Sequence, residues 1–387
     1  MQCTNTDQLG LKKPSFTEGI DYRLDLDGPT IKALGYGTTN KDRSLSLMEF
    51  DRRAPGPDDV VIEIAFCGVC HSDWHVILNE WKNTKYPTIV GHEITGYVVK
   101  KGYNVTKFNI GDTVALGPNF NSCRSCNSCR EGNEQYCLND VTETYNMPER
   151  LPNEYPAPNE KVLPTGPITY GGYSNIIVAD QNFVLSVPKG APLDRVAPIL
   201  CAGITMYTPL KSLGINSSHR VGIAGIGGLG HIGVKLAKSM GAQVVGLTHT
   251  PAKLDNDLNM DKVLLVQDLD TLREYNCTFD LIICTAPFNH DMTPYIELMK
   301  PNGVVWIVGS MFPMTVDFDL INRKGRIVRG SSTGNIADTQ ELIDYCVTNN
   351  IYPDIELIDI KNINETHRPI IMSEVRYRYV ATGFDKM

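Results

Sequence analysis

Short apolar runs separated by turn residues fill the first half of the chain. Residues 60–65 and 97–99 are apolar runs of strand length, and the second leads into a Gly-Asp turn at Gly111 and Asp112. No long run in this half repeats its apolar residues at helical spacing. The pattern therefore predicts an irregular, mainly β region from residue 31 to about residue 180.

Strand-like and helix-like runs alternate from about residue 196 onward. Such alternation is typical of an α/β region, in which helices cover a parallel sheet. The sequence predicts strands at 220–224, 243–247, 279–284 and 303–308 and helices at 229–239 and 338–349.

The length of 387 residues favours about two domains. We expect a polar N-terminal extension at 1–30, a mainly β catalytic domain made of 31–200 and 334–387, and an α/β cofactor domain at 201–333. The proline-rich stretch 138–170 is longer than an ordinary connection. It is expected to be a functional lid or a surface insertion, and the sequence leaves both open.

The net charge of −8, from 36 basic and 44 acidic residues, argues against nucleic-acid partners and against an anionic membrane surface. The sequence holds no apolar run near the roughly 18 residues that span a bilayer. Its N-terminus lacks the basic start and apolar stretch of a secretory signal. A cytoplasmic protein that acts on a small molecule is therefore expected.

Four of the 11 cysteines fall within fifteen residues, at Cys123, Cys126, Cys129 and Cys137. In a cytosolic protein such a cluster is more often a metal site than a disulfide framework. Four thiolates can enclose one structural zinc ion tetrahedrally. The alternatives are four unconnected buried cysteines, whose polar neighbours would make a poor core, and a nucleic-acid zinc ribbon, for which the cluster holds few basic residues.

Three further potential ligands are spread along the chain at Cys70, His92 and Cys201. A catalytic zinc needs three protein ligands and an open fourth position, which two sulfurs and one nitrogen can provide. Each residue taken singly is more often part of a packed core. Their occurrence together with the four-cysteine cluster and a nucleotide motif favours a catalytic metal site.

Polar residues beside these ligands suggest the supporting chemistry. Asp73 could accept a hydrogen bond from a ligand histidine. Ser72 and His75 could carry the alcohol proton to water, because a hydroxyl both donates and accepts and histidine titrates near neutrality. Glu93 is expected to support the metal ligands or to act as an alternative ligand.

Residues 225–230 match the dinucleotide-binding pattern G-x-G-x-x-G through Gly225, Gly227, Gly228, Leu229 and Gly230. The match follows a predicted strand and opens a predicted helix, which is the context that gives the pattern its meaning. Glycines there let backbone N–H groups approach a pyrophosphate at the helix N-terminus. We therefore predict a dinucleotide cofactor.

The end of the next predicted strand distinguishes NAD from NADP. An NAD enzyme usually places an acid there to bind the ribose hydroxyls. This chain instead has Thr248, Thr250 and Lys253, which could hold a 2′-phosphate, and its nearest acids, Asp255 and Asp257, come later. NADP is favoured; a solvated loop is the alternative, and it would leave the missing acid unexplained.

Together these motifs resemble the medium-chain zinc alcohol dehydrogenases, and among them the cinnamyl-alcohol-dehydrogenase-like branch. The similarity runs from about residue 31 to residue 380. The stretches that carry it are 67–73, 86–93, the four-cysteine cluster, 170–174, 200–205, 225–230, 339–341 and 375–380.

The resemblance implies a GroES-like catalytic domain and a doubly wound Rossmann domain with the active site between them, usually in a homodimer. It implies catalytic zinc on Cys70, His92 and Cys201, structural zinc on the four-cysteine cluster, and a proton relay through Ser72 and His75. It also implies NADP as cofactor and aldehydes, often aromatic or unbranched aliphatic, as substrates.

Several departures from the family pattern bear on the substrate. Trp74 stands where a smaller aliphatic residue is common, and it is expected to narrow the pocket. Residues 254–261 and 309–311 also differ, as do the long stretch 138–170 and the N-terminal extension.

The leading hypothesis is reversible hydride transfer between NADP(H) and an alcohol–aldehyde pair, with the protein acting as an aldehyde reductase. The alternatives are a zinc-independent C=C or C=N reductase on the same fold and a nonenzymatic zinc- and NADP-binding protein. The sequence does not identify the alcohol or aldehyde.

Overall fold

A computed structural model shows how the chain folds. It describes residues 26–387 except 43, 151–165, 255–257, 287–289 and 310–312. The expected extension at 1–30 and the centre of the stretch 138–170 therefore lie largely outside the described residues. Asp255 and Asp257 lie outside them as well.

The C-terminal half contains a six-stranded sheet in which every neighbouring pair is parallel, as the alternating pattern predicted. Its strand order is β12-β11-β10-β13-β14-β15, so the chain reverses its direction of winding between β10 and β13. Ligands of open α/β sheets bind at this reversal, outside the carboxyl ends of the strands. The strands are β10 Arg220–Ala224, β11 Gln243–Thr248, β12 Lys262–Leu265, β13 Phe279–Cys284, β14 Met299–Ile307 and β15 Ile327–Gly330.

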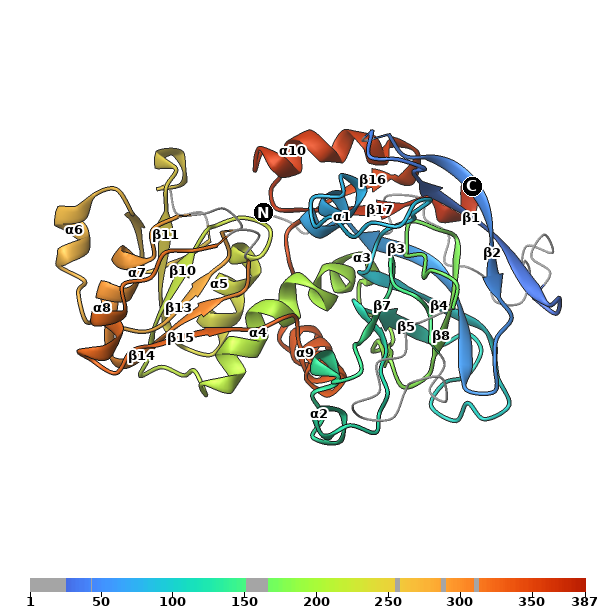
Figure 1. Ribbon diagram of the computed structural model, residues 1–387, viewed down its shortest axis with the longest axis horizontal. Coiled ribbons are helices and arrows are strands. Elements are labelled where there is room, and N and C mark those ends of the chain that lie inside the picture. The colour runs from blue at the N-terminus through green and yellow to red at the C-terminus, as the bar shows by residue number, and fades with distance from the viewer. Residues whose placement is uncertain (1–25, 43, 151–165, 255–257, 287–289, 310–312) are drawn as a thin grey trace.

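Helices flank this sheet, and two of them lie between it and the rest of the molecule. Figure 1 shows α4 and α9 in the middle of the molecule, between the two large sheets. Their apolar residues, with those of α5, belong to one continuous buried core. The helices are α4 Ala202–Ser212, α5 Gly230–Ser239, α6 Leu269–Arg273, α7 Thr293–Leu298, α8 Phe318–Asn322 and α9 Ile336–Asn349.

A second, seven-stranded sheet combines strands from residues 59–186 with two strands from the C-terminal end of the chain. Its path is β16-β17-β3-β4-β5-β9, and β8 pairs with β3 off this path. β16 and β17 come from the C-terminal end, and β17 adds antiparallel to β3. The strands are β3 Asp59–Gly68, β4 Ile94–Lys101, β5 Thr113–Leu116, β8 Ile176–Asp180, β9 Val184–Ser186, β16 Ile355–Asp359 and β17 Arg378–Thr382.

Smaller elements complete this half. They are the antiparallel pairs β1 Thr30–Gly37 with β2 Ser46–Arg53 and β6 Asn119–Asn121 with β7 Thr142–Glu143, and the short helices α1 His71–Ile77, α2 Asn127–Arg130, α3 Leu193–Val196 and α10 His367–Ile371. Frequent strands and few helices agree with the predicted mainly β region.

The two flanks of the stretch 138–170 pair with each other. Pro148 and Ile168 form an antiparallel bridge, and the Glu149 amide donates to the Pro167 carbonyl at 2.8 Å. The flanks are therefore ordered parts of the fold, and the open question of a lid or an insertion concerns only residues 151–165.

Within the described ranges, no helix is long and apolar enough to cross a membrane.

Candidate active site between the two sheets

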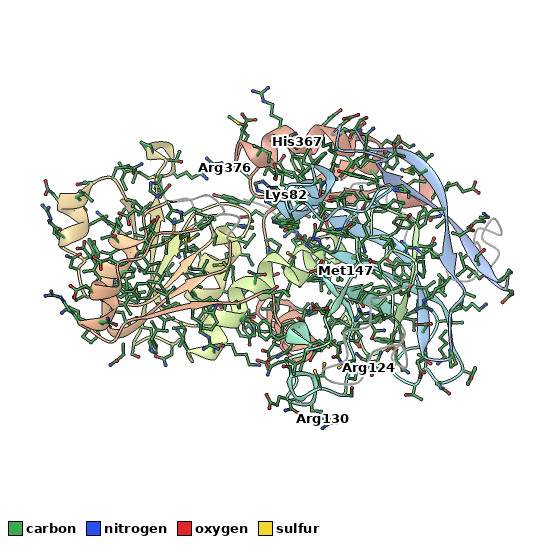
Figure 2. The ribbon with its side chains drawn as sticks, viewed as in Figure 1. Lys82, Arg124, Arg130, Met147, His367 and Arg376 are labelled. Atoms are coloured by element: carbon green, nitrogen blue, oxygen red, sulfur yellow. The ribbon has the colours of Figure 1, made fainter. Side chains whose placement is uncertain are left out.

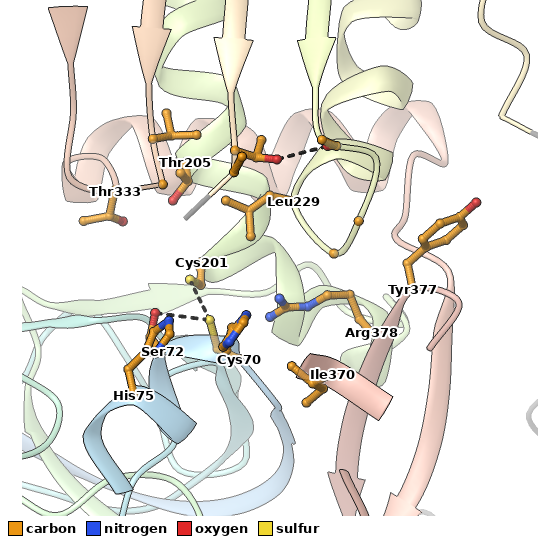
Figure 3. Close-up of a pocket in the computed structure, with 18 of the residues that line it drawn as sticks. Cys70, Ser72, His75, Cys201, Thr205, Leu229, Thr333, Ile370, Tyr377 and Arg378 are labelled. Carbon is orange, nitrogen blue, oxygen red and sulfur yellow. Dashed lines mark hydrogen bonds between the residues drawn. The ribbon is translucent and has the colours of Figure 1, made fainter. Parts of the chain in front are cut away.

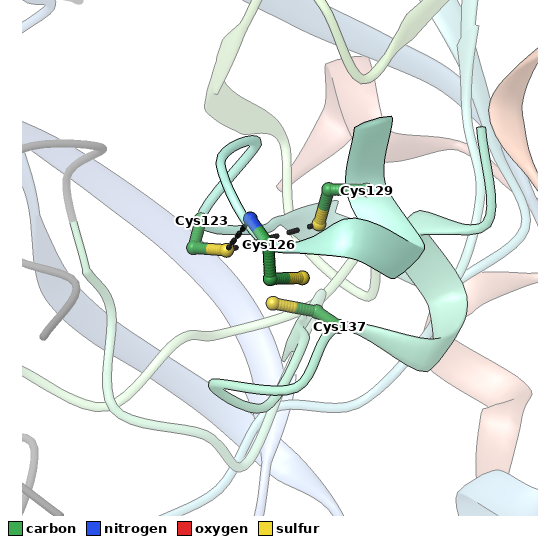
Figure 4. Close-up of side chains that lie close together, drawn as sticks. All are labelled: Cys123, Cys126, Cys129 and Cys137. Carbon is green, nitrogen blue, oxygen red and sulfur yellow. Dashed lines mark hydrogen bonds between the residues drawn. The ribbon is translucent and has the colours of Figure 1, made fainter. Parts of the chain in front are cut away.

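The four clustered cysteines converge in a small lobe beside the seven-stranded sheet. Cys126 is the N-cap of α2, Cys129 lies within α2, and Cys123 and Cys137 flank it in sequence. Their sulfurs lie within 4.8 Å of one another, and Cys123 Sγ is 3.9 Å from Cys129 Sγ (Figure 4). Two thiolates on one tetrahedral zinc, each at about 2.3 Å, are separated by about 3.8 Å. The four residues therefore fit a closed zinc site.

Backbone groups around this four-cysteine cluster point at the sulfurs. The Cys126 amide donates to Cys123 Sγ at 3.3 Å, and the Leu138 amide donates to Cys126 Sγ at 3.4 Å. Burial opposes ionisation of Cys123, but backbone hydrogen bonds from Ser125 and Cys126 lower its pKa to about 6. Burial raises the pKa values of Cys129 and Cys137, so these two thiols would lose their protons on binding a metal ion. The local turns thus orient the ligands without help from the rest of the molecule.

Cys70, His92 and Cys201 form a second cluster, although 131 positions separate the two cysteines in the chain. Cys70 is the N-cap of α1 and Cys201 is the N-cap of α4, so two helix starts bring the thiols together. Their sulfurs are 3.8 Å apart, again the separation expected on one tetrahedral zinc. The Glu93 carboxylate lies in the same cluster.

The two thiols of this cluster have opposite pKa shifts. A hydrogen bond from Cys201 lowers the pKa of Cys70 well below its usual value, and the same contact raises the pKa of Cys201. Two buried thiolates at this distance repel each other unless a cation lies between them. The donor set therefore fits a divalent metal ion, with three protein ligands and room for a fourth.

Asp73 contacts two of the three metal-ligand candidates, Cys70 and His92, and fixes their positions. Its buried carboxylate accepts hydrogen bonds from the Cys70 amide at 2.9 Å, the Gly91 amide at 3.1 Å and the Tyr173 hydroxyl at 2.9 Å. It also lies 3.2 Å from His92 Nδ1, where the sequence predicted a carboxylate partner. With Nδ1 so engaged, Nε2 is the nitrogen left for a metal.

Two partners of this cluster have no counterpart among the predicted site residues. The Tyr145 hydroxyl lies 3.0 Å from His92 Nδ1, and Arg378 forms a buried ion pair with Glu93. Burial raises the pKa of Glu93 to about 7, against the opposing charge of Arg378. Arg378 belongs to the stretch 375–380, which carries the family resemblance, but neither it nor Tyr145 was assigned a role there, and only the fold shows their contacts with the cluster.

The proton-relay candidates Ser72 and His75 lie on the face of α1 that borders a cavity. Ser72 and His75, three positions apart, both line a cavity, and Ser72 Oγ is 3.6 Å from Cys70 Sγ. His75 Nδ1 lies 2.5 Å from a carboxylate oxygen of Glu80, a partner that the sequence did not reveal. No hydrogen bond within the described chain joins Ser72 directly to His75.

Trp74 does not narrow the pocket, and that expectation was wrong. The side chain is 1% exposed, packs in the core of the mainly β half and lies against His367 at 4.6 Å between ring centroids. It points away from the cavity because Trp74 and Ile77 share the helix face opposite Ser72 and His75. Trp81, at 43% exposure, is the tryptophan that lines the cavity.

The glycines of residues 225–230 serve different purposes. Gly225 has a φ of +94°, and a Cβ on Gly230 would lie 2.0 Å from the Gly225 carbonyl oxygen. These two positions need glycine for the turn and for the close approach of the helix to the strand. A Cβ on Gly227 would meet no protein atom within 4 Å. The space beside Gly227 opens into the cavity, where a ligand's phosphates would lie.

Thr248, Thr250 and Lys253 line the same cavity at the carboxyl end of β11. Lys253 Nζ donates to the Ile226 carbonyl at 2.9 Å, which holds the amine beside the glycine-rich loop. Burial and the nearby Arg376 lower the pKa of Lys253. Glu143 is the only acidic residue among the described residues that line the cavity.

One cavity of about 1100 Å³ joins these parts. It contains the second metal cluster, Ser72 and His75 on one side and the glycine-rich loop and the end of β11 on the other. Figure 3 shows Cys201 facing Cys70, with Leu229 above them and Arg378 reaching in from the C-terminal strand. Figure 2 places Arg376 near the opening between the two halves. All candidate residues outside the four-cysteine cluster thus lie in or beside one space.

Two family descriptions match separate parts of the chain. Residues 56–189 match the alcohol dehydrogenase GroES-like domain, and residues 228–348 match the zinc-binding dehydrogenase domain. The first covers the strands and cysteines of the mainly β half, and the second covers most of the parallel sheet.

Relatives match over nearly the whole chain. A probable zinc-type alcohol dehydrogenase-like protein of Acanthamoeba polyphaga mimivirus is 40% identical over 93% of this chain and 84% of that protein. A mannitol dehydrogenase of Apium graveolens is 40% identical over 90% of this chain and 93% of that protein.

Solved structures agree with this similarity. A cinnamyl alcohol dehydrogenase from Sorghum bicolor superposes with a TM-score of 0.85 at 36% identity, over 91% of this chain and 97% of that one. A cinnamyl alcohol dehydrogenase from Helicobacter pylori, complexed with NADP(H), gives 0.82 at 37% identity, over 92% and 99%.

Proposed function

This chain belongs to the zinc-type alcohol dehydrogenase family, and on that premise we propose that it transfers hydride between NADP(H) and an alcohol–aldehyde pair, acting as an aldehyde reductase. The observation that carries the proposal is that one cavity holds both a three-ligand metal cluster and a dinucleotide loop. Reduction of a carbonyl needs both: a group that polarises the oxygen and a cofactor that supplies the hydride.

Cys70, His92 and Cys201 would hold the catalytic zinc, and the four-cysteine cluster would hold a structural one. When bound at the first site, zinc acts as a Lewis acid on the carbonyl oxygen. Asp73 fixes the His92 ring through Nδ1, and the Glu93–Arg378 pair lies next to the ligands as a neutralised, buried couple.

Ser72 and His75 would manage the proton. The Ser72 hydroxyl, next to Cys70, donates to the oxygen of the forming alcohol, and His75 restores that proton from solvent. Because no direct hydrogen bond links the two side chains in the described structure, the proton would pass between them through a further hydroxyl group or a water molecule. Glu80 holds His75 through Nδ1 and keeps its other nitrogen available for this path.

NADP is the proposed cofactor, and the H. pylori relative was solved with it. Gly225, Gly227, Gly228, Leu229 and Gly230 would surround the pyrophosphate. Thr248, Thr250 and Lys253 would bind the 2′-phosphate, with Arg376 adding positive charge at the same end of the cavity.

The proposal is tested with a panel of aldehydes, assayed with NADPH and NADH in parallel, and with zinc analysis. We expect reduction with NADPH, about two zincs per chain, and a Lys253→Ala variant whose KM rises about tenfold or more for NADPH but little for NADH. Lys262→Ala, on β12 outside the cavity, is the matched control. One zinc per chain with C=C or C=N reduction would favour the zinc-independent alternative, and no NADPH oxidation with any aldehyde would favour a nonenzymatic protein.

We also propose the organisation expected from the sequence: residues 31–200 and 334–387 as one domain, residues 201–333 as the other, and a homodimer. β15 is the edge strand of the parallel sheet and all four of its residues are exposed, including Ile327 and Val328. Such an edge can pair with the same strand of a second copy. Light scattering should give twice the chain mass, and Val328→Lys should shift the protein toward the monomer.

A cytosolic location is proposed as well, because the ten cysteines of the described residues form no disulfide and the site needs free thiols.

A further inference from the structure

The charged residues of the cavity are divided between its two ends. Lys253 and Arg376 line the part that borders the end of β11, and Arg378 lies between the glycine-rich loop and Glu93, whose charge it balances. Glu143, the one acidic residue among the described lining, comes from β7 in the mainly β half. A carboxylate repels the phosphates of a dinucleotide, and Glu143 belongs to β7 rather than to the end of β11, where an acid would bind ribose hydroxyls. It therefore requires a separate explanation.

Glu143 lies at the reaction end of the cavity. Tyr145, two residues later, contacts the metal-ligand candidate His92. Although its surface is open to the cavity, the surrounding protein raises the pKa of Glu143, and the charge of nearby His92 opposes that effect. In the described chain its carboxylate forms no ion pair or hydrogen bond, so its oxygens remain available to a ligand.

Two more polar side chains of the cavity wall lack partners. The Gln135 side-chain oxygen and the Thr333 hydroxyl are buried, and no described residue hydrogen-bonds to either. A buried polar atom without a partner is costly, and a bound molecule that supplies the missing hydrogen bond recovers that cost.

Contacts of neighbouring residues bring these side chains into one corner. Asn119 pairs with Glu143 across the β6–β7 ribbon, and its amide donates to the carbonyl of Gly334, next to Thr333, at 3.0 Å. The Ile336 amide donates to Glu134, next to Gln135, at 2.7 Å. In Figure 3 Thr333 lies on the same side of the cavity as Ser72 and His75, and Tyr377 lies on the opposite side.

An aromatic surface contributes the other wall of the reaction end. The Trp81 ring lies 5.2 Å from the His75 ring and is 43% exposed. A partly hydroxylated molecule could therefore place its apolar face on Trp81 and its hydroxyl groups toward the polar corner.

We propose that Gln135, Glu143 and Thr333 form a hydroxyl-recognising corner, so that the preferred substrates are aldehydes and alcohols that carry a further hydroxyl group away from the reacting carbon and no negative charge. This inference rests on the proposed dehydrogenase function. A carboxylate accepts a hydroxyl hydrogen bond more strongly than a neutral acceptor does, and it repels an anionic substrate. An analogue without the hydroxyl leaves the corner unpaired.

The test compares benzaldehyde, 3- and 4-(hydroxymethyl)benzaldehyde and 4-carboxybenzaldehyde as substrates with NADPH. The hydroxymethyl group adds a hydroxyl while changing the electronics of the carbonyl little. We expect kcat/KM to be about tenfold or more higher for at least one hydroxymethyl compound than for benzaldehyde, and lowest for the carboxylate. Glu143→Gln should raise kcat/KM for 4-carboxybenzaldehyde about tenfold, and Thr333→Val and Gln135→Leu should each reduce the hydroxymethyl preference severalfold.

Benzaldehyde, which lacks the additional hydroxyl group, distinguishes failure of the hydroxyl-recognising corner from failure of the proposed dehydrogenase function. Its reduction should change less than about threefold in all three variants, and Glu131→Gln, an exposed acid of the same lobe outside the cavity, should change nothing. If benzaldehyde is reduced but the hydroxyl makes no difference, or if Glu143→Gln scales all four substrates alike, the corner is refuted and the dehydrogenase stands. If the wild-type protein reduces none of the four aldehydes with NADPH, the proposed function fails first and this inference falls with it.

Discussion

Both metal-ligand clusters contain cysteine sulfurs, but the chain brings these sulfurs together in two different ways. In the four-cysteine cluster all ligands come from residues 123–137, and local turns aim backbone amides at the sulfurs. In the second cluster Cys70, His92 and Cys201 come from three separate segments and meet only when α1, the loop before β4 and α4 are in place. The sulfur separations are nearly equal, at 3.9 and 3.8 Å.

This difference explains why one cluster suits support and the other suits chemistry. A closed set of four thiolates leaves no position for a substrate, whereas two thiolates and one imidazole leave one open toward the cavity. The local cluster also fixes its lobe to α9, since Glu134 accepts a hydrogen bond from the Ile336 amide at the start of that helix. We therefore expect the four-cysteine cluster to contribute to shape and stability and the second cluster to contribute to the reaction.

The largest effect is expected when a ligand is removed from the second cluster, Cys70, His92 and Cys201, which is called the open cluster below. Cys201→Ala should lower kcat/KM for aldehyde reduction at least about 10³-fold, because several kcal/mol of charge stabilisation are lost at about 1.4 kcal/mol per factor of ten. Zinc content should fall from about two to about one per chain while the circular dichroism spectrum is retained. Cys277→Ser, outside the cavity, should leave the rate within about twofold; full activity of Cys201→Ala would contradict the assignment.

A smaller effect is expected from the residue that positions His92. Asp73→Asn keeps the shape of the side chain but weakens its contact with His92 Nδ1, so zinc affinity and kcat should each fall about 10- to 100-fold. Competition with a metal indicator measures the affinity. Asp194→Asn alters another buried acid, on α3, and should leave zinc affinity unchanged. Equal losses in the two variants would mean that Asp73 acts only through stability.

Chelation should distinguish the clusters without mutation. Dipicolinate at a concentration that removes zinc from the open cluster of about nine chains in ten should lower activity about tenfold, in proportion to the zinc that remains there, with little change in Tm. Added zinc should restore the activity. Loss of Tm before loss of activity would reverse the roles given to the two sites.

The smallest effect on rate is expected at the four-cysteine cluster. Cys129→Ser should lower Tm by about 5 °C or more, since metal binding there contributes to folding. Reduction of benzaldehyde per folded molecule should remain within about twofold at 25 °C. A large fall in kcat with an unchanged Tm would show that the cluster takes part in the chemistry.

The sequence predicted those parts of the molecule whose residues are linked by short spacing. The four-cysteine cluster, the glycine-rich loop and the strand–helix alternation each occupy a continuous stretch, and the parallel sheet formed where the pattern indicated. No short spacing joins Cys70, His92 and Cys201, so their grouping depended on their occurrence beside the other motifs and on the family resemblance, and the fold brings them together.

Contacts that depend on which face of an element is buried were missed or wrong. Helical spacing places Trp74 with Ile77 on the buried face of α1, opposite Ser72. The family pattern, which compares single positions, instead predicted Trp74 in the pocket, and that prediction was wrong. Tyr145 reaches the site from a loop position without a motif, and Arg378, although it lies in the family-like stretch 375–380, reaches it from a strand whose place beside the metal cluster only the fold shows. Glu143 was unremarked because one acid in a long irregular stretch has no pattern.

Arg378 has a consequence for the exchange of parts between relatives. It belongs to β17, at the C-terminal end of the chain, yet its guanidinium pairs with Glu93 beside the open cluster and its side chain lies against Gly228 of the glycine-rich loop. In a chimera that takes only the six-stranded sheet and its helices from a relative, Arg378 of this chain would contact the glycine-rich loop of the other protein. Because the two halves share this residue, grafting a new cofactor preference onto this scaffold would require β17 to be transplanted together with the loop it touches.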